Sequence, residues 1–460
     1  MPRQHLLTDF HRPHYHFLPP ANWMNDPNGL IQWQGKYHLF YQHNPSGPLW
    51  GDIHWGHAAS LDLIHWEDLP IALTPTPGGS DERGCFSGCA INADGVPTII
   101  YTGVRGERHQ IQTQNMATGS DDLLTWQKYA GNPIISQMPE FLGQTSDFRD
   151  PFVWKEGDTW YMVLGSRVQD VGGIALLYRS RNLTEWEYLH PLHSHQGEPG
   201  RGIWECPNFF PFGDQWVLII SGHDGINTGT VIYFVGTYQN QQFTPTTQGV
   251  LDYGTLYAPL TFADQSGRRL LFGWLRESRS DDEQRQAGWS GVQSIPRVLA
   301  LDSQNRLVMT PVPELDVLRG QQHHIDARDL GEETPLDVRG LALDIQAEFS
   351  LQPDGRCGFA LLCSQDGSER TEVIYEAAGQ RIVVRSGANV REIPHSLAEN
   401  EPLTLRILLD GSVIEIIANG RTSVTYRAYP TSADHDGVLL IGAKARLQAL
   451  DLWEMPSIWA

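Results

Sequence analysis

A seven-residue motif occurs three times along the chain at a spacing of 60 residues. Its copies are Ser60–Trp66, Ser120–Trp126 and Ser180–Trp186, which share the pattern SxDLxxW with Asn in place of Asp in the third copy. The segment 237–243 is at most a degraded fourth copy. A fixed period of this length predicts repeated supersecondary units.

Each repeat also contains two runs of strand-forming residues separated by a polar turn. Five such pairs occur, in the segments 29–42, 87–102, 151–164, 208–221 and 258–274. Units of roughly 50 to 65 residues, each with room for four short strands, predict a five-bladed β-propeller. A β-sandwich with long loops is the alternative, but it does not explain the fixed period.

The character of the sequence changes after residue 312. Residues 313–340 combine prolines, a short helix-compatible piece at Glu314–Leu318 and a polar run, and they are predicted to form a linker. From residue 341 to 460, short strand-like runs alternate with turns such as Asp410-Gly411, which is typical of a β-sandwich. We therefore expect an all-β protein with a propeller at 1–312, a linker at 313–340 and a sandwich at 341–460 that supports the first domain.

Charge and composition limit the partners. The 33 Lys and Arg against 54 Asp and Glu give a net charge of −21, which disfavours nucleic acid and anionic membranes. No window approaches a membrane span of about 18 uncharged apolar residues. The first 22 residues lack the apolar run of a secretory signal, and five cysteines are few for 460 residues. We expect a cytoplasmic monomer or homodimer without disulfides.

Three acidic residues stand at Pro-bounded starts of predicted first strands. They are Asp26 in the run NDP, Asp150 in RDP and Glu205 in ECP. Taken alone, the run NDPNG at 25–29 is a rigid Asx turn that opens a strand. However, the innermost strand of every propeller blade lines the central channel. We therefore expect the three acids, from the first, third and fourth units, to meet at one end of the channel.

Two carboxylates around one bond are what glycoside hydrolysis requires. The two must differ in pKa, because one stays ionised while the other carries a proton. Asp26, in a turn rich in donors, suits the ionised role, and Glu205, beside Trp204, suits the acid with a raised pKa. Asp150, preceded by Arg149, is suited to bind sugar hydroxyls and to favour positive charge on the sugar.

The chain resembles glycoside hydrolase family 32, the β-fructofuranosidases, along essentially its whole length. The shared blocks are RPHYHF at 12–17, WMNDPNG at 23–29, FYQHNP at 40–45, HWGHAASLDLIHW at 54–66, FSGCA at 86–90, FRDP at 148–151, WECP at 204–207, AGWSGVQSIPR at 287–297, DGSVIEIIANG at 410–420 and RAYP at 427–430. The resemblance implies that Asp26 is the nucleophile, Glu205 the acid/base and Asp150 the stabiliser of the transition state. It also implies substrate contacts by Asn25, Gln42, Trp50, Phe86, Ser87 and Arg149, with Tyr257 and Trp274 as further candidates. Cys89 stands where the family usually has Ser, and the roles of Cys85 and Cys89 are open.

Several of these residues have plainer structural explanations. Trp50 and Trp274 are also suited to packing between blades, and Gln42 and Ser87 to satisfying turns. The histidines at 54 and 57, and those in HRPHYH at 11–16, have no Cys or acidic partner at ligand spacing, so no metal site and no cofactor are expected. Cys206 adjoins the acid, but the expected chemistry needs no thiol.

The expected function is a retaining exo-hydrolase that releases terminal β-D-fructofuranosyl residues from a small sugar, with sucrose as the first candidate. A sucrose-6-phosphate hydrolase and a fructosyltransferase share the same chemistry and stay open, and a non-catalytic glycan-binding propeller is the remaining alternative. Arg105, Arg108 and Arg149 are the candidates for binding a phosphate group, and none of them is required to do so.

Overall fold

The structure is a computed structural model that describes residues 6, 8–107, 111–143, 145–168, 171–195, 197, 202–224 and 228–459. The chain forms two compact units. Unit 1 comprises residues 17–252 and 256–312, and the other described residues form unit 2. Strands and turns make up almost all of both units, and the described residues include a single α-helix, α1 (Asp281–Ala287), in unit 1. None of the described helices is both long and apolar enough to cross a membrane.

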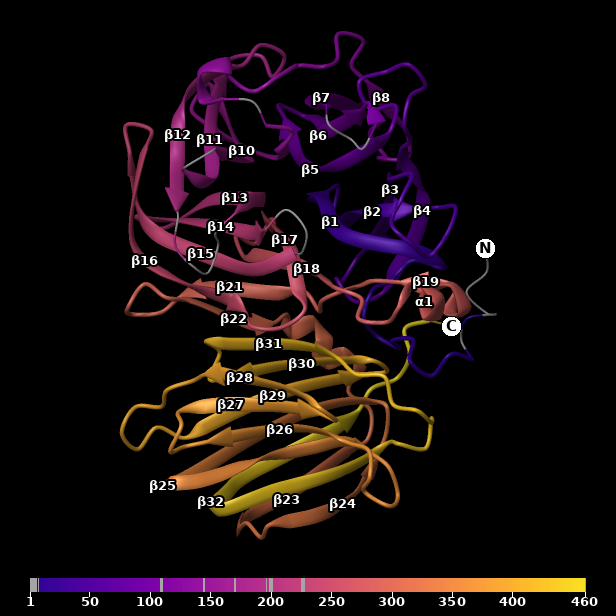
Figure 1. The fold of residues 1–460 in the computed structure, drawn as a ribbon, viewed down its shortest axis with the longest axis vertical. Coiled ribbons are helices and arrows are strands. Elements are labelled where there is room, and N and C mark those ends of the chain that lie inside the picture. The colour runs from indigo at the N-terminus through magenta and orange to yellow at the C-terminus, as the bar shows by residue number, and fades with distance from the viewer. Residues whose placement is uncertain are drawn as a thin grey trace. The chain divides into compact units, whose positions relative to one another are not determined.

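Unit 1 is the predicted five-bladed β-propeller (Figure 1). Blade 1 consists of β1 (Asn22–Trp33), β2 (Lys36–Asn44), β3 (His54–Ser60), β4 (Trp66–Leu73) and β19 (Trp289–Ser290). Blade 2 consists of β5 (Gly84–Ala93), β6 (Val96–Arg105), β7 (Ile111–Gly119) and β8 (Trp126–Lys128). Blade 3 consists of β9 (Phe148–Glu156), β10 (Thr159–Val168), β11 (Gly172–Ser180) and β12 (Glu187–His195), and η3 (Glu140–Leu142) precedes it. Blade 4 consists of β13 (Ile203–Phe212), β14 (Gln215–His223), β15 (Thr228–Gln239) and β16 (Gln242–Asp252). Blade 5 consists of β17 (Leu256–Ala263), β18 (Arg269–Leu275), β20 (Val292–Gln293), β21 (Arg297–Leu301) and β22 (Leu307–Pro311).

The first strands of the five blades contact one another in a closed ring. β1 contacts β5, β5 contacts β9, β9 contacts β13, β13 contacts β17, and β17 contacts β1. The ring is also joined by β19, which pairs in parallel with β1 through Asn22 and Trp289. The prediction that first strands converge on the axis is therefore confirmed.

The repeated motif occupies the same turn in three blades, between the third and the fourth strand. In each copy the indole nitrogen of the tryptophan donates to the carbonyl of the leucine three residues earlier, at 2.8 to 3.1 Å. That leucine has a positive φ, of 68°, 57° and 66° at residues 63, 123 and 183. The motif thus encodes one tight, side-chain-supported connection between outer strands.

Every first strand contains a β-bulge near its start. The pairing register shifts between residues 24 and 27, 85 and 88, 149 and 152, 205 and 208, and 257 and 260. Four of these sites contain an X-Pro step, and proline has no N–H to offer the ladder. Asp26 therefore lies inside β1, and the prediction that its run forms a turn before the strand is wrong.

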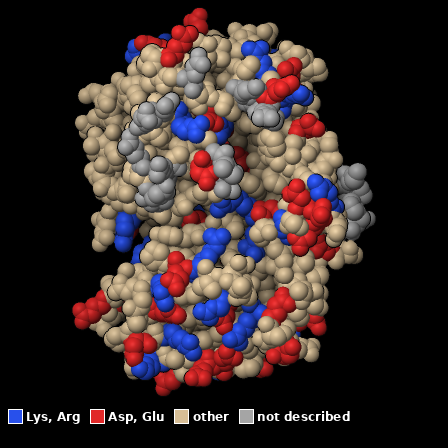
Figure 2. Space-filling model, in the orientation of Figure 1, with Lys and Arg blue, Asp and Glu red and all other residues tan. Residues whose placement is uncertain are grey.

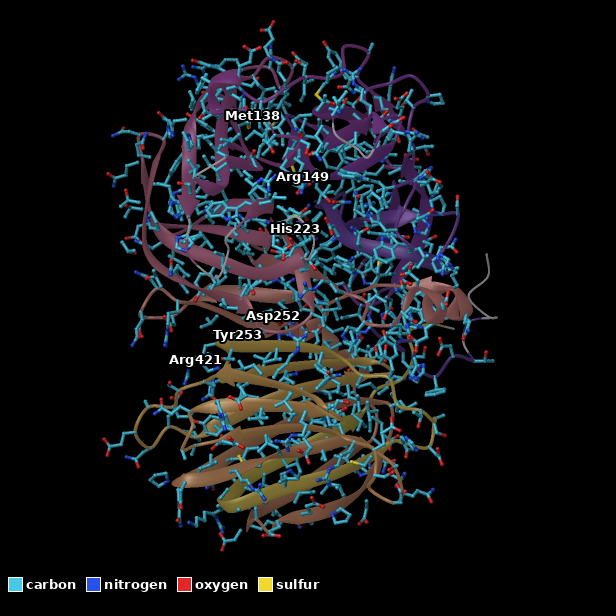
Figure 3. All side chains as sticks on the ribbon, viewed as in Figure 1. Met138, Arg149, His223, Asp252, Tyr253 and Arg421 are labelled. Carbon is cyan, nitrogen blue, oxygen red and sulfur yellow. The ribbon has the colours of Figure 1, made fainter. Side chains whose placement is uncertain are left out.

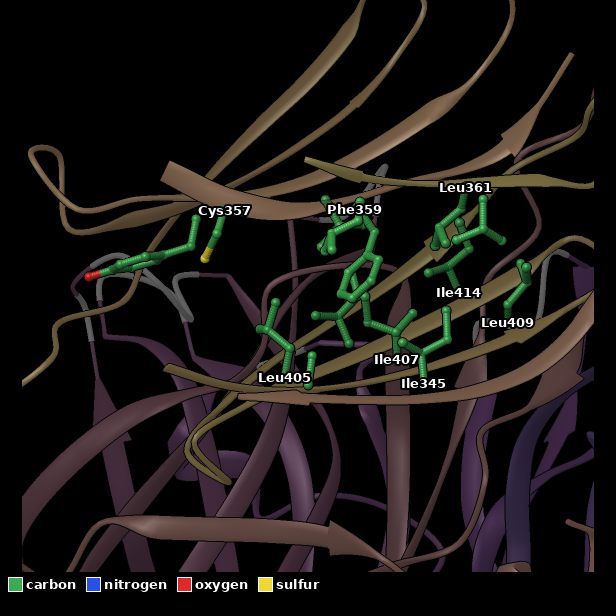
Figure 4. Close-up of a cluster of buried hydrophobic side chains, with 14 of the residues drawn as sticks. Ile345, Cys357, Phe359, Leu361, Leu405, Ile407, Leu409 and Ile414 are labelled. Carbon is green, nitrogen blue, oxygen red and sulfur yellow. The ribbon is translucent and has the colours of Figure 1, made fainter. Parts of the chain in front are cut away.

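Unit 2 is a single ten-stranded antiparallel sheet that curls into two layers. Its strands are β23 (Gln322–Asp329), β24 (Glu333–Arg339), β25 (Ala342–Cys363), β26 (Thr371–Glu376), β27 (Arg381–Ser386), β28 (Asn389–Pro394), β29 (Leu403–Asp410), β30 (Val413–Ala418), β31 (Thr422–Arg427) and β32 (Gly437–Glu454). The long strand β25 pairs with β29 along its first part and with β26 along its last part, so it belongs to both layers. Figure 4 shows the apolar side chains that fill the space between the layers, among them Phe359 and Ile407.

The predicted linker at 313–340 is not a linker. It contains η4 (Pro313–Leu318) and the strands β23 and β24, both of which pair with β32. These strands are mostly exposed and polar because they lie at sheet edges, which is why their sequence resembles a loop.

An N-terminal segment also belongs to unit 2. The backbone N–H groups of His14, Tyr15 and His16 all donate to the carboxylate of Asp410, at 2.5 to 2.8 Å. The buried ring of His16 lies between Asp410 and Glu415, at 2.8 and 3.1 Å. The blocks RPHYHF and DGSVIEIIANG, far apart in sequence, therefore meet here.

On one face of the protein the charged side chains are dispersed (Figure 2). Figure 2 shows acidic and basic side chains interspersed over the face in view. This agrees with the interpretation that the net charge of −21 does not form one binding surface.

Candidate active site

One pocket of about 520 Å³ opens at the axis of the propeller. Its lining contains all eleven residues predicted for the site: Asn25, Asp26, Gln42, Trp50, Phe86, Ser87, Arg149, Asp150, Glu205, Tyr257 and Trp274. It also contains five that were not predicted: Gln112, Ser146, Asp147, His223 and Thr228. The structure therefore brings the candidates from all five blades together.

Beyond this pocket the channel narrows to a space too small for a sugar. A space of only about 10 Å³ adjoins the pocket at Ser87 and Asp150. The bulged prolines at positions 27, 151, 207 and 259 line it. A sugar entering from the mouth thus meets a floor.

Asp26 lies on this floor within reach of donors from three blades. Its Oδ2 accepts a hydrogen bond from Ser87 Oγ at 2.6 Å and lies 3.5 Å from Cys206 Sγ, and its Oδ1 accepts from Asn25 Nδ2 at 3.1 Å. Burial raises the pKa of Asp26 to about 6, although the hydrogen bond from Ser87 opposes the rise. Without substrate, Asp26 is therefore mostly ionised at neutral pH and becomes protonated as the pH falls through about 6.

Asp150 is held beside it by the backbone of the next blade. Its Oδ2 accepts from the N–H of Cys206 at 2.9 Å, and its own N–H donates to Thr102 Oγ1 at 2.9 Å. Its φ of 64° is in the left-handed region, at the β-bulge of β9. Burial raises the pKa of Asp150 to about 7, although Arg149 opposes the rise.

Glu205 is held at both carboxylate oxygens. Arg149 donates to Oε1 from Nη2 at 2.7 Å and from Nε at 3.2 Å, and Tyr257 donates to Oε2 at 2.5 Å. Burial alone would raise the pKa of Glu205, but Arg149, His223 and the Tyr257 hydroxyl together lower it below its usual range. The expectation of a raised pKa for Glu205 is therefore wrong for the free site. The reason is that Arg149 forms its closest contacts with Glu205 rather than with its sequence neighbour Asp150.

Arg149 connects the floor of the pocket with its rim. Its Nη1 donates to Asp147 Oδ1 at 2.8 Å and to Gln112 Oε1 at 3.2 Å. Figure 3 shows Arg149 and His223 toward the centre of unit 1, where the blades meet. The guanidinium thus lies between two carboxylates, those of Glu205 and Asp147.

Aromatic side chains form much of the wall. Trp50 is 48% exposed, and its ring centroid lies 6.1 Å from that of Phe86 in an edge-to-face contact. Trp274 makes a similar contact with Tyr257 at 6.4 Å. Trp50 lines the pocket with about half of its surface exposed, whereas Trp274 also packs against Trp23 at 5.7 Å. Both explanations considered for Trp274, packing and lining, therefore apply.

Among the five lining residues that sequence reasoning missed, only Asp147 had a usable signal, because it directly precedes the FRDP block. Gln112 and His223 lie on β7 and β14, away from any of the recognised blocks. Ser146 and Thr228 likewise carried no motif. Their positions follow from how the blades surround the axis.

The histidines and cysteines show no sign of metal chemistry in the described part of the chain. No group of three or more His, Cys, Asp and Glu side chains is placed there to hold a metal ion. The buried His57 stacks on Phe40 at 4.0 Å and contacts His38 at 3.0 Å. All five cysteines are buried free thiols.

Sequence comparisons match the chain along nearly its full length. The profile for the Glycosyl hydrolases family 32 N-terminal domain matches residues 16–311, and that for the family 32 C-terminal domain matches residues 314–454. A sucrose-6-phosphate hydrolase of Zymomonas mobilis is 37% identical, with 97% of this chain and 91% of the relative covered. The cell wall isozyme of β-fructofuranosidase from Pisum sativum is 34% identical, with 95% and 92% covered.

Solved structures also resemble this chain along nearly its full length. A variant of fructan 1-exohydrolase IIa from Cichorium intybus in complex with 1-kestose has a TM-score of 0.86 at 27% identity, with 97% of this chain and 98% of that chain covered. A variant of the Bombyx mori β-fructofuranosidase BmSUC1 in complex with sucrose has a TM-score of 0.84 at 29% identity, with 99% and 96% covered.

Proposed function

Because this chain belongs to glycosyl hydrolase family 32 and is a β-fructofuranosidase-type glycoside hydrolase, we propose that it releases terminal β-D-fructofuranosyl residues with retention of configuration. The observation that carries this proposal is the meeting of Asp26, Asp150 and Glu205 in one pocket. Two carboxylates, one as nucleophile and one as acid/base, are sufficient for a retaining double displacement.

In the proposed reaction, Asp26 attacks the anomeric carbon of the fructosyl unit while Glu205 protonates the leaving oxygen. Glu205 then removes a proton from water, which attacks the fructosyl-enzyme and restores Asp26. Asp150 lies beside both, where its carboxylate can accept hydrogen bonds from sugar hydroxyls and, in its ionised form, favour positive charge in the transition state.

Glu205 must carry a proton when it acts, although Arg149 and Tyr257 stabilise its ionised form in the free site. Sugar hydroxyls that enter the pocket compete with Glu205 for these two donors. Substrate binding therefore shifts Glu205 toward the protonated form that the first step needs.

The closed floor supports exo action. A pocket that ends at the bulged prolines accepts one chain end and leaves the rest of the substrate at the mouth. The exposed face of Trp50 is suited to stack against a sugar at that mouth.

We propose that the substrate is a disaccharide of the sucrose type, with sucrose 6-phosphate ahead of free sucrose. The relative at 37% identity is named for the phosphate ester, which supports this substrate better than the sucrose expected from sequence. Of the three arginines considered for the phosphate, Arg149 lines the pocket but is already paired, Arg105 is outside the lining, and Arg108 lies outside the described residues. The cytoplasmic location stays a prediction.

The test is the initial rate of fructose release from sucrose, sucrose 6-phosphate and inulin at low substrate concentration. A tenfold preference for the phosphate ester, equivalent to about 1.4 kcal/mol in transition-state binding, supports the proposed substrate. Equal or better cleavage of sucrose makes the protein an invertase. Oligosaccharide products that increase at high sucrose indicate transfer to sugar, and turnover of none of these substrates contradicts the proposal.

A further inference from the structure

The guanidinium of Arg149 forms two close ion pairs through different nitrogens and a longer one, at 3.9 Å from its Nε, with Asp150. Its Nη2 contacts Glu205 at 2.7 Å, and its Nη1 contacts Asp147 at 2.8 Å. Arg149 is buried, so its charge must be balanced by neighbouring groups rather than by water. Neither the shared sequence blocks nor the chemistry proposed above gives Asp147 a role.

Asp147 is itself held firmly in place. Its Oδ2 accepts from Thr145 Oγ1 at 3.2 Å and lies 3.3 Å from Arg167 Nη2, and its carbonyl accepts from Ser166 Oγ at 2.5 Å. The Arg167 side chain is 46% exposed, whereas Asp147 is buried. Its carboxylate therefore acts more strongly on buried Arg149 than on half-exposed Arg167.

We propose that Asp147 is a positioning residue for the acid/base carboxyl: it holds the far end of Arg149 and shares the guanidinium charge with Glu205. The inference rests on the proposed function, in which Glu205 donates a proton to the leaving oxygen. The inference adds a residue that changes the proton affinity of Glu205.

The physical argument concerns the state in which Glu205 is neutral. When Glu205 takes up a proton, Arg149 loses one of its two closest anionic partners. Asp147, together with the more distant Asp150, keeps the guanidinium compensated in that state, so it lowers the cost of protonating Glu205. Without the charge of Asp147, Arg149 stabilises ionised Glu205 more strongly.

Among the described residues, five other titratable groups face Glu205, each from a different strand. None of them is altered when Asp147 is replaced. They are Asp26 on β1, Asp150 on β9, Cys206 on β13, His223 on β14 and Tyr257 on β17.

The experiment measures kcat/KM over pH for two substrates. One is the better of sucrose and sucrose 6-phosphate, whose leaving group needs a proton. The other is 4-nitrophenyl β-D-fructofuranoside, whose leaving group does not. Both reactions require ionised Asp26, so the ratio of the two rates follows the protonation of Glu205, together with that of the substrate phosphate where sucrose 6-phosphate is used, which is the same for every variant.

In Asp147→Asn, the midpoint of this ratio is expected to move to lower pH by about 0.5 to 1 unit, a loss of roughly three- to tenfold in the ratio above the midpoint. Asp147→Glu keeps the charge and should return the midpoint toward that of the unmodified protein. Asp94→Asn is the matched control, because it removes one exposed carboxylate that pairs with Lys155.

Arg167→Gln tests the same relation at a half-exposed position, even if Asp147→Asn fails to fold. With Arg167 gone, Asp147 acts on Arg149 alone, and the midpoint should move slightly to higher pH. An unchanged midpoint in a folded Asp147→Asn, or a fall in Arg167→Gln, overturns the inference. If the unmodified protein cleaves neither substrate, it is the proposed function that fails.

Discussion

The hydroxyl of Tyr257 on blade 5 donates a 2.5 Å hydrogen bond to Oε2 of Glu205 on blade 4. The other carboxylate oxygen of Glu205 is held from blade 3 by Arg149. The candidate acid/base is therefore fixed from both neighbouring blades. Its proton affinity depends on contacts that no single blade contains.

Replacing Tyr257 by Phe should raise the pKa of Glu205. The hydroxyl stabilises the ionised carboxylate, and a hydrogen bond to a charged group contributes roughly 1.5 to 3 kcal/mol. The midpoint of the rate ratio between disaccharide and 4-nitrophenyl fructoside is expected to move to higher pH by about one unit. A shift to lower pH would show that the hydroxyl does not act on Glu205 as a donor.

Replacing Glu205 by Gln should slow cleavage of the disaccharide much more than cleavage of the 4-nitrophenyl fructoside. Loss of a general acid lowers the rate on sucrose or its phosphate ester by roughly two to four powers of ten. The 4-nitrophenyl fructoside should lose much less in the glycosylation step, which pre-steady-state release of 4-nitrophenol measures. Equal losses on both substrates would count against the assignment of Glu205.

Replacing Ser87 by Ala should raise the pKa of Asp26 above its value of about 6. Ser87 Oγ donates to the Oδ2 of Asp26 at 2.6 Å and stabilises its ionised form. The acidic limb of kcat/KM for 4-nitrophenyl fructoside should therefore move up by about one unit, with roughly tenfold loss at low pH. Ser146→Ala, at an exposed position of the same pocket, serves as the control.

Replacing Asp26 by Asn should abolish turnover of both substrates and stabilise unit 1 at alkaline pH. The folded carboxyl has a raised pKa, so the native state binds more protons than the unfolded state between about pH 3.8 and 6. Stability is therefore lost as pH rises through this window. Asn removes that cost, with an expected gain of about 3 kcal/mol at pH 8 and little gain at pH 4. Scanning calorimetry at the two pH values measures the difference, and an equal gain at both would contradict the explanation.

Replacing Phe359 by Ala should destabilise unit 2. Its ring is fully buried in the core between the layers, 6.0 Å from that of Phe349. Such a truncation costs about 3 to 5 kcal/mol. Urea unfolding followed by fluorescence measures it, and Val390→Ala, at a 49% exposed position, should change stability by less than about 0.5 kcal/mol.

Local sequence signals predicted the propeller and the meeting of the three acids, because both follow from the repeat. The period of 60 residues gives the blades, and the X-Pro steps mark the same bulged place in four of five first strands. Side chains at these places must approach the axis.

Contacts between blades could not be predicted in the same way. The run RDP suggests that Arg149 serves Asp150, but its guanidinium lies 3.9 Å from that carboxylate and donates its hydrogen bonds to Glu205 and Asp147. This pairing lowers the pKa of Glu205, while burial raises that of Asp26, so the order expected for the two carboxyls is reversed. The edge strands β23 and β24 were also missed, since partnership with the distant strand β32, rather than their own composition, makes them strands.

The segment 289–293, which contains β19 and β20 and contacts β1, has a consequence for the order in which the site is completed during synthesis. Gln293 Nε2 donates at 2.7 Å to the carbonyl of Asn25, the residue before the candidate nucleophile. A ribosome must therefore add about 270 further residues before the backbone at Asp26 gains this support. Until then β1 has an open edge, and such an edge invites pairing with other chains. The support of the backbone beside Asp26 by residue 293 is thus acquired late, through one contact that spans most of unit 1.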